Sequence, residues 1–163
     1  MIDAAVAAVL AMLPYLGHQA LFGAIAAAGF GVLFNFGGRA LIWCAVAGAL
    51  ALAVRTFGQQ CGGSLEAASF LAAAVTSCAA ILSRRWLGVA CHAIALAGCI
   101  PMVPGAFFGQ ALLGFMWVAG ASTDHTVPAI VGSVQAFVRV ISTVGAIGAG
   151  LTIPAYLLRS RQF

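Results

Sequence analysis

The sequence predicts an all-α integral membrane protein with about five transmembrane helices, the fourth of which is broken in its middle. Hydrophobic residues make up 64% of the 163 residues and charged residues only 6%. The mean hydropathy of +1.13 lies far outside the range of a soluble globular domain. A third observation is local, because two prolines and a glycine interrupt a long apolar run at residues 100–105.

Five apolar segments are separated by short polar or glycine-rich stretches and form a single membrane domain over residues 1–163. We expect the first span at residues 13–34, because Pro14 and His18 interrupt a run that is longer than the ~20 residues a bilayer core needs. No basic region of a secretory signal precedes it, so this segment is expected to be retained. The other spans are expected at residues 40–57, 65–82, 86–119 and 127–158.

The break lies in the fourth span, in the block Ile-Pro-Met-Val-Pro-Gly. Proline donates no backbone hydrogen bond and clashes with the preceding turn, and lipid cannot satisfy the backbone groups that are freed. Discontinuous helices bind solutes in many transporters. The alternative interpretation of this break is a plain proline kink in a packing helix. The break therefore predicts a substrate-binding site at Pro101, Met102, Val103, Pro104 and Gly105.

The arginines predict the orientation, because cytoplasmic loops collect Lys and Arg. One side receives Arg39, Arg84, Arg85, Arg159 and Arg161, and the opposite side receives Asp3, Arg55, Glu66 and Asp124. We therefore expect the N-terminus outside and the C-terminus in the cytoplasm. A re-entrant hairpin at residues 86–119 would move the arginine tail to the outer face, so a spanning, broken helix is the favoured interpretation.

A few polar residues lie within or beside the spans. Asn35 and Arg39 either line the cytoplasmic entrance of a solute path or act as a helix cap and a topogenic arginine. Arg139 either contacts the solute, snorkels outward or pairs with a carboxylate of another subunit, since an unpaired charge in a span usually faces a cavity or a partner. Gln110 is either a ligand of the solute or a hydrogen-bond partner of another helix. His92 is either a proton relay or a hydrogen-bonded structural residue. Asn35, Arg39, Arg139 and Gln110 are therefore added to the candidate substrate-binding residues.

Small residues recur every four positions in four of the spans, which favours close packing of membrane helices. The predicted packing faces are Gly23/Ala27/Gly31, Ala45/Ala49/Ala53, Ala68/Ala72/Thr76/Ala80 and Ser142/Ala146/Gly150. The five cysteines have no Cys-x-x-Cys spacing and are expected to be packing residues without a disulfide.

The sequence lacks the residues that several kinds of chemistry need. The sequence has no nucleophile elbow, phosphate-binding loop or zinc-spaced His/Cys set, so we predict no enzyme activity, catalytic residue, metal or cofactor. Haem ligation by His18 and His92 is disfavoured, because they are expected at opposite ends of the bundle. The net charge of +4 forms no basic cluster, which argues against nucleic-acid binding. No acidic residue lies in the core of a span, so a carboxylate proton carrier is expected on another subunit.

Four blocks, in this order and spacing, resemble the threonine/serine exporter (ThrE) family. They are GFGVLFN at residues 29–35, RALIWC at 39–44, IPMVPG at 100–105 and LTIP at 151–154. More closely, the chain is similar to the small YjjB-like subunit of the two-component members, the partner of a YjjP-like protein that exports succinate. That subunit corresponds to the C-terminal half of the single-chain exporters.

The resemblance implies a function that composition and spacing do not. It implies a hetero- or homo-oligomer with a larger membrane subunit in the bacterial cell inner membrane. It also implies outward transport of threonine and serine, or of C4-dicarboxylates such as succinate. A non-transporting membrane anchor or scaffold subunit is the alternative.

Overall fold

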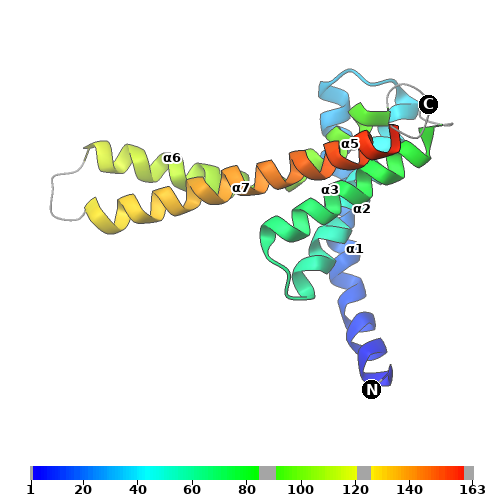
Figure 1. Cartoon of the computed structure of the whole chain (residues 1–163), viewed down its shortest axis with the longest axis horizontal. Coiled ribbons are helices and arrows are strands. Elements are labelled where there is room, and N and C mark those ends of the chain that lie inside the picture. Colours follow the sequence, from blue (N-terminus) through cyan, green and yellow to red (C-terminus); the bar gives the residue numbers. More distant parts are fainter. Residues whose placement is uncertain (1, 85–90, 121–125, 160–163) are drawn as a thin grey trace.

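The computed structural model describes residues 2–84, 91–120 and 126–159, and every regular element within them is a helix (Figure 1). This confirms the all-α class. The elements are α1 (Ile2–Leu33), α2 (Gly38–Gln60), α3 (Leu65–Leu82), α5 (Cys91–Cys99), the 3-10 helix η2 (Ile100–Met102), α6 (Gly105–Gly120) and α7 (Thr126–Arg159). Within the described residues, four helical stretches are long and apolar enough to cross a membrane, namely Met12–Leu33, Gly38–Gln60, Leu65–Leu82 and Val127–Leu158.

The predicted fourth span consists of two helical pieces that meet at the break. Cys91–Met102 and Gly105–Gly120 are bent by 55° relative to each other, and a fifth crossing results if they form one span. A 55° bend lets the second piece continue forward instead of turning back, which favours a broken span over a hairpin. The predicted orientation remains a prediction, and its residues 85–90, Asp124 and Arg161 lie outside the described residues.

Small residues bring the helices into close contact, and two of the predicted faces are confirmed. Gly23, Ala27 and Gly31 are all buried on α1, and a Cβ added to Gly23 would lie only 2.5 Å from the carbonyl oxygen of Gly48 on α2. On α3 the whole predicted face is buried, as Ala68, Ala72, Thr76 and Ala80. These close approaches replace the hydrophobic driving force that helices lack in lipid.

The predicted face of α2 is wrong by about one residue, and the predicted face of α7 is confirmed only at Gly150, which is buried against Phe70 and Ala73 of α3. Ala45, Ala49 and Ala53 are only half-buried, whereas α2 buries Cys44, Ala47, Gly48 and Ala51. On α7, Ser142 is exposed and Ala146 half-buried, and the neighbouring Thr143 and Ile147 are buried instead. In both helices small residues also occupy the adjacent positions, so the four-residue spacing alone does not select the packed face.

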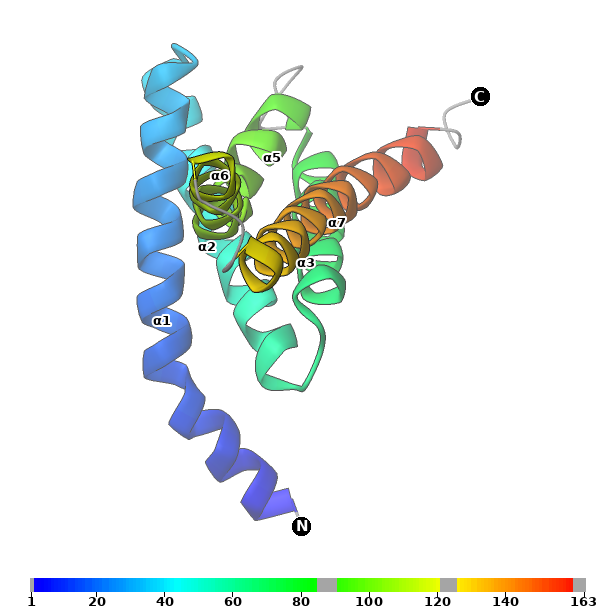
Figure 2. The same cartoon turned by 90° about the vertical axis from the view of Figure 1, so that its left-hand side faces the viewer.

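The helix α6 and residues 126–141 of α7 form a hairpin, which we call the arm. Figure 1 shows the arm extending away from the other helices, and Figure 2 shows α1 running crosswise to it. Phe115 and Phe137 hold the two helices together with ring centroids 6.2 Å apart. Many large apolar side chains on the arm are exposed, among them Phe108, Leu112, Leu113, Met116, Trp117, Val131, Val134 and Val138. The other described helices leave these side chains uncovered.

Candidate binding site at the helix break

The break is a short turn that joins η2 to α6. The N–H of Val103 donates to the carbonyl of Ile100 at 3.0 Å, and the N–H of Gly105 donates to the carbonyl of Val103 at 2.8 Å. Pro104 is buried and has no N–H to donate. The first regular bond of α6 runs from Phe108 N–H to the carbonyl of Pro104 at 3.1 Å.

Two backbone donors are left at the start of α6. The N–H groups of Ala106 and Phe107 have no hydrogen-bond acceptor within the described residues. Together with the positive end of the helix dipole, such donors favour an anionic group. Of the residues predicted at the break, Met102 and Pro104 are buried, whereas Val103 and Gly105 are exposed.

An arginine reaches the break from α2. Arg55 Nη1 donates to the carbonyl oxygen of Met102 at 2.8 Å, and the Met102 side chain is fully buried. Arg55 Nε is also buried and has no hydrogen-bond partner within the described residues. A cation at the C-terminal end of a helix stabilises its free carbonyls, so Arg55 caps the first half of the broken helix.

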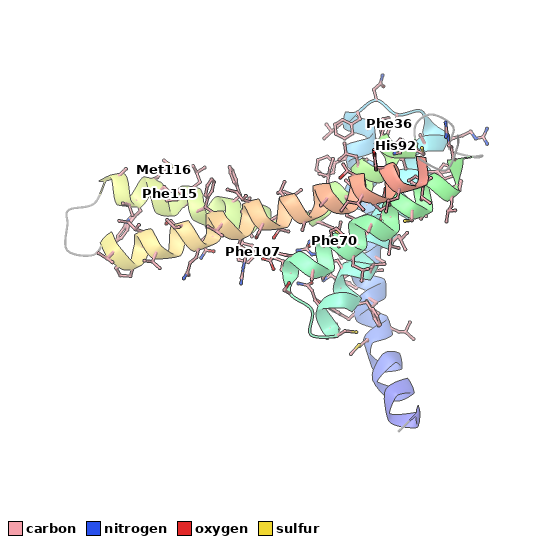
Figure 3. The ribbon with its side chains drawn as sticks, in the orientation of Figure 1. Phe36, Phe70, His92, Phe107, Phe115 and Met116 are labelled. Atoms are coloured by element: carbon pink, nitrogen blue, oxygen red, sulfur yellow. The ribbon has the colours of Figure 1, made fainter. Side chains whose placement is uncertain are left out.

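A second guanidinium lies just beyond the break. Arg139 on α7 packs over the ring of Phe107, with Cζ 5.2 Å from the ring centroid. Figure 3 shows Phe107 at the base of the arm. Arg139 itself is exposed and forms no ion pair with the described carboxylates. One turn further along α7, Ser142 Oγ donates to Glu66 Oε1 at 3.4 Å.

Asn35 and Arg39 lie at the opposite end of α2 and are not brought to the break. They are exposed, and the sixteen residues from Arg39 to Arg55 correspond to about 24 Å along the helix. Asn35 has φ +56°, and Phe36 N–H donates to the carbonyl of Gly31 at 3.0 Å. This is the geometry of a left-handed helix C-cap. A role at the entrance of a solute path remains a prediction.

Two substitutions distinguish a capping role of Asn35 from a role in the solute path. Asn35→Gly keeps the left-handed cap and removes the amide, so we expect stability in detergent to be unchanged or slightly higher. Asn35→Val should lower it by roughly 1–2 kcal/mol because of its positive φ. Denaturation of both purified variants with sodium dodecyl sulfate measures this. Loss of export by a stable Asn35→Gly protein would show that the amide serves the solute path and not only the cap.

His92 and Gln110 also lie away from the bend. His92 is exposed on α5, and Figure 3 shows it near Phe36, at the Asn35 end of the bundle. Gln110 is exposed on the arm. His18 contacts Phe22 with the ring centroids 4.7 Å apart and the rings tilted by 59°. It lies fifteen residues, about 23 Å, before the end of α1. His18 and His92 therefore do not meet, and the relay role of His92 stays a prediction.

Sequence reasoning missed Arg55. It counted this arginine only among the charges of the outer side, although Arg55 falls within the expected span 40–57 and α2 continues to Gln60. That continuity was the available signal, because it puts the arginine inside a helix and not after it.

Comparison with known proteins places the chain in a family. The sequence model of the family described as "Threonine/Serine exporter, ThrE" matches residues 19–157. No solved structure matches the chain. Because the family match covers most of the sequence, including the break and every candidate residue, this multi-pass membrane protein belongs to the threonine/serine exporter family.

Proposed function

We propose that the chain is the membrane subunit of a two-component secondary exporter of small carboxylate-bearing metabolites. The substrates are threonine and serine, or C4-dicarboxylates such as succinate, and the location is the bacterial cell inner membrane. The observation that carries the proposal is the broken helix, bent by 55°, in a chain of the exporter family. Broken helices aim backbone groups at a solute in other secondary transporters.

The chemistry around the break suits a carboxylate. The N–H groups of Ala106 and Phe107, which have no acceptor within the described residues, favour an anion. Of the two nearby guanidinium groups, Arg55 binds the carbonyl of Met102 and Arg139 packs over the ring of Phe107. In this proposal residues 101–105 form the central site, and Arg139 and Gln110 contribute from the arm. Asn35 and Arg39 line the cytoplasmic entrance, and His92 is the candidate proton relay.

A larger partner subunit is part of the proposal. The exposed apolar side chains of the arm need cover from lipid or protein, and Arg139 is exposed in the middle of the candidate span Val127–Leu158. A charge at that depth usually faces a partner or a cavity. The one acidic side chain that the structure describes, Glu66, lies beside Ser142 at the start of α3. The coupling carboxylate is therefore assigned to the partner.

Efflux from cells tests this proposal. Cells are loaded with labelled threonine, serine or succinate, and they make this chain, a candidate larger subunit, or both. We expect efflux only when both subunits are present. Full efflux from the larger subunit alone would reduce this chain to an anchor or scaffold, and no efflux in any combination would contradict the exporter function.

A further inference from the structure

We propose that Arg55, Ser69 and the first turn of α6 form a subsite that holds one carboxylate group of the transported solute. This inference rests on the proposed function and assigns the carboxylate to particular atoms. Neither Arg55 nor Ser69 belongs to the site expected from the sequence.

Arg55 has unused hydrogen-bonding capacity at the break. A guanidinium carries five N–H donors in a fixed fork, and Arg55 uses one of its terminal nitrogens on the carbonyl of Met102. Nε is buried without a partner, and no described carboxylate pairs with the side chain. A guanidinium can bind both oxygens of a carboxylate along one edge. Since an unpaired cation within a membrane bundle is unfavourable, this edge favours an anionic ligand.

Ser69 provides an independent indication. Its side chain is 0% exposed, and its Oγ has no hydrogen-bond partner within the described residues. Two other buried hydroxyls of α3 do have hydrogen-bond partners. Thr76 donates to the carbonyl of Ala72 at 2.8 Å, and Ser77 donates to the carbonyl of Leu151 at 2.9 Å. A buried hydroxyl without a partner is rare and calls for an explanation.

The position of Ser69 on α3 directs it toward the break. Residues four apart lie on one helix face, so Ser69 shares its face with Ala73. Ala73 packs in one buried cluster with Cys99 and Met102, at the end of α5 and in η2. Ser69 is one turn nearer to the start of α3 than Ala73. The hydroxyl therefore lies on the side of α3 that faces η2 and the start of α6.

The nearby charges leave the subsite positive. Glu66 is one turn before Ser69, but its carboxylate accepts from Ser142 on α7 and not from Arg55. Arg139 lies over Phe107, in the first turn of α6. The donors thus come from three helices, and they recognise only the carboxylate. The remainder of the solute is left free, which suits both an amino acid and a dicarboxylate.

Binding measurements with the purified protein, prepared together with the larger subunit if the two associate, test the subsite. The probes are radiolabelled threonine and succinate, and the competitors are threoninamide and succinamide. We expect Ser69→Ala and Arg55→Lys to weaken binding about tenfold each, the effect of one hydrogen bond to a charged group. The amides should not compete. Ser77→Ala is the matched control, because it also removes a buried hydroxyl of α3, and its binding should stay within about twofold.

The lysine variant separates binding from capping. Lysine keeps the positive charge beside the Met102 carbonyl but lacks the two-nitrogen edge. If Arg55 only caps the helix, Arg55→Lys and Ser69→Ala will bind both probes as the unaltered protein does, which overturns the inference and leaves efflux to decide the exporter function. Equal weakening in Ser77→Ala, or unaltered protein that binds neither probe, also overturns it. Each variant is first shown to elute as a single species in size-exclusion chromatography.

Discussion

Export is expected to stop when Pro104 and Gly105 are replaced together by leucine and alanine, while the protein still inserts into the membrane. Leucine restores the N–H that proline lacks, and alanine favours a helix over the flexible glycine. The backbone between the two halves would then become helical, with Pro101 as the remaining kink, and the 55° bend is expected to be lost. Ala106 N–H, now without an acceptor, would bond to the carbonyl that Arg55 holds.

The expected fall in efflux is at least about tenfold, since a loss of about 1.4 kcal/mol in solute binding is sufficient. Membrane fractionation checks insertion, which should be unaffected because both new residues are apolar. Pro14→Leu is the matched control, because Pro14 is an exposed proline inside α1 and far from the break in the chain. Unchanged efflux from the double variant would remove the break from the transport site.

The spans could be predicted from the sequence because they depend on length and composition. Apolar runs of about 20 residues have few alternatives to a membrane helix, and α2 and α3 were expected at almost the positions where they lie. The helix α2 is longer than expected, at Gly38–Gln60. Arg55 already falls within the expected span 40–57, but its bond to the carbonyl of Met102 could not be predicted from the bounds of the span. The prediction counted this arginine among the charges of the outer side and assigned it no contact within the bundle.

The direction of the arm could not be predicted. Nearly every residue of α6 is apolar, so its sequence does not distinguish a face toward the bundle from a face toward lipid. Its position is set mainly by packing along α7, for example at Gly114, where an added Cβ would overlap Ser133. The prolines predict where the chain changes direction, but the sequence does not predict the 55° angle between the two helices. The partnerless hydroxyl of Ser69 likewise becomes visible only in three dimensions.

Replacement of Gly48 by valine is expected to destabilise the protein by about 3 kcal/mol or more, the upper range for overpacking a tight contact. A Cβ on Gly48 would overlap the carbonyl oxygen of Gly23 and the Cβ of Ala27, both on α1. Because the first of these atoms belongs to the backbone, a rotamer change cannot relieve the clash. The helices α1 and α2 would have to move apart. Denaturation with sodium dodecyl sulfate, in detergent micelles, measures the loss.

Gly29→Ala is the control, because a Cβ on that α1 glycine would meet nothing within 4 Å. Its stability should be equal or higher by up to ~1 kcal/mol, the helix propensity gained. Equal stability of the two variants would contradict the α1–α2 contact. Separation of α1 and α2 should also disturb the candidate site at the helix break. The α5 residue Gly98 lies so close to α2 that a Cβ added to it would be 3.1 Å from the backbone nitrogen of Gly48. A displaced α5 carries Met102 with it, so partly folded Gly48→Val protein should bind carboxylates more weakly through loss of the Arg55 contact.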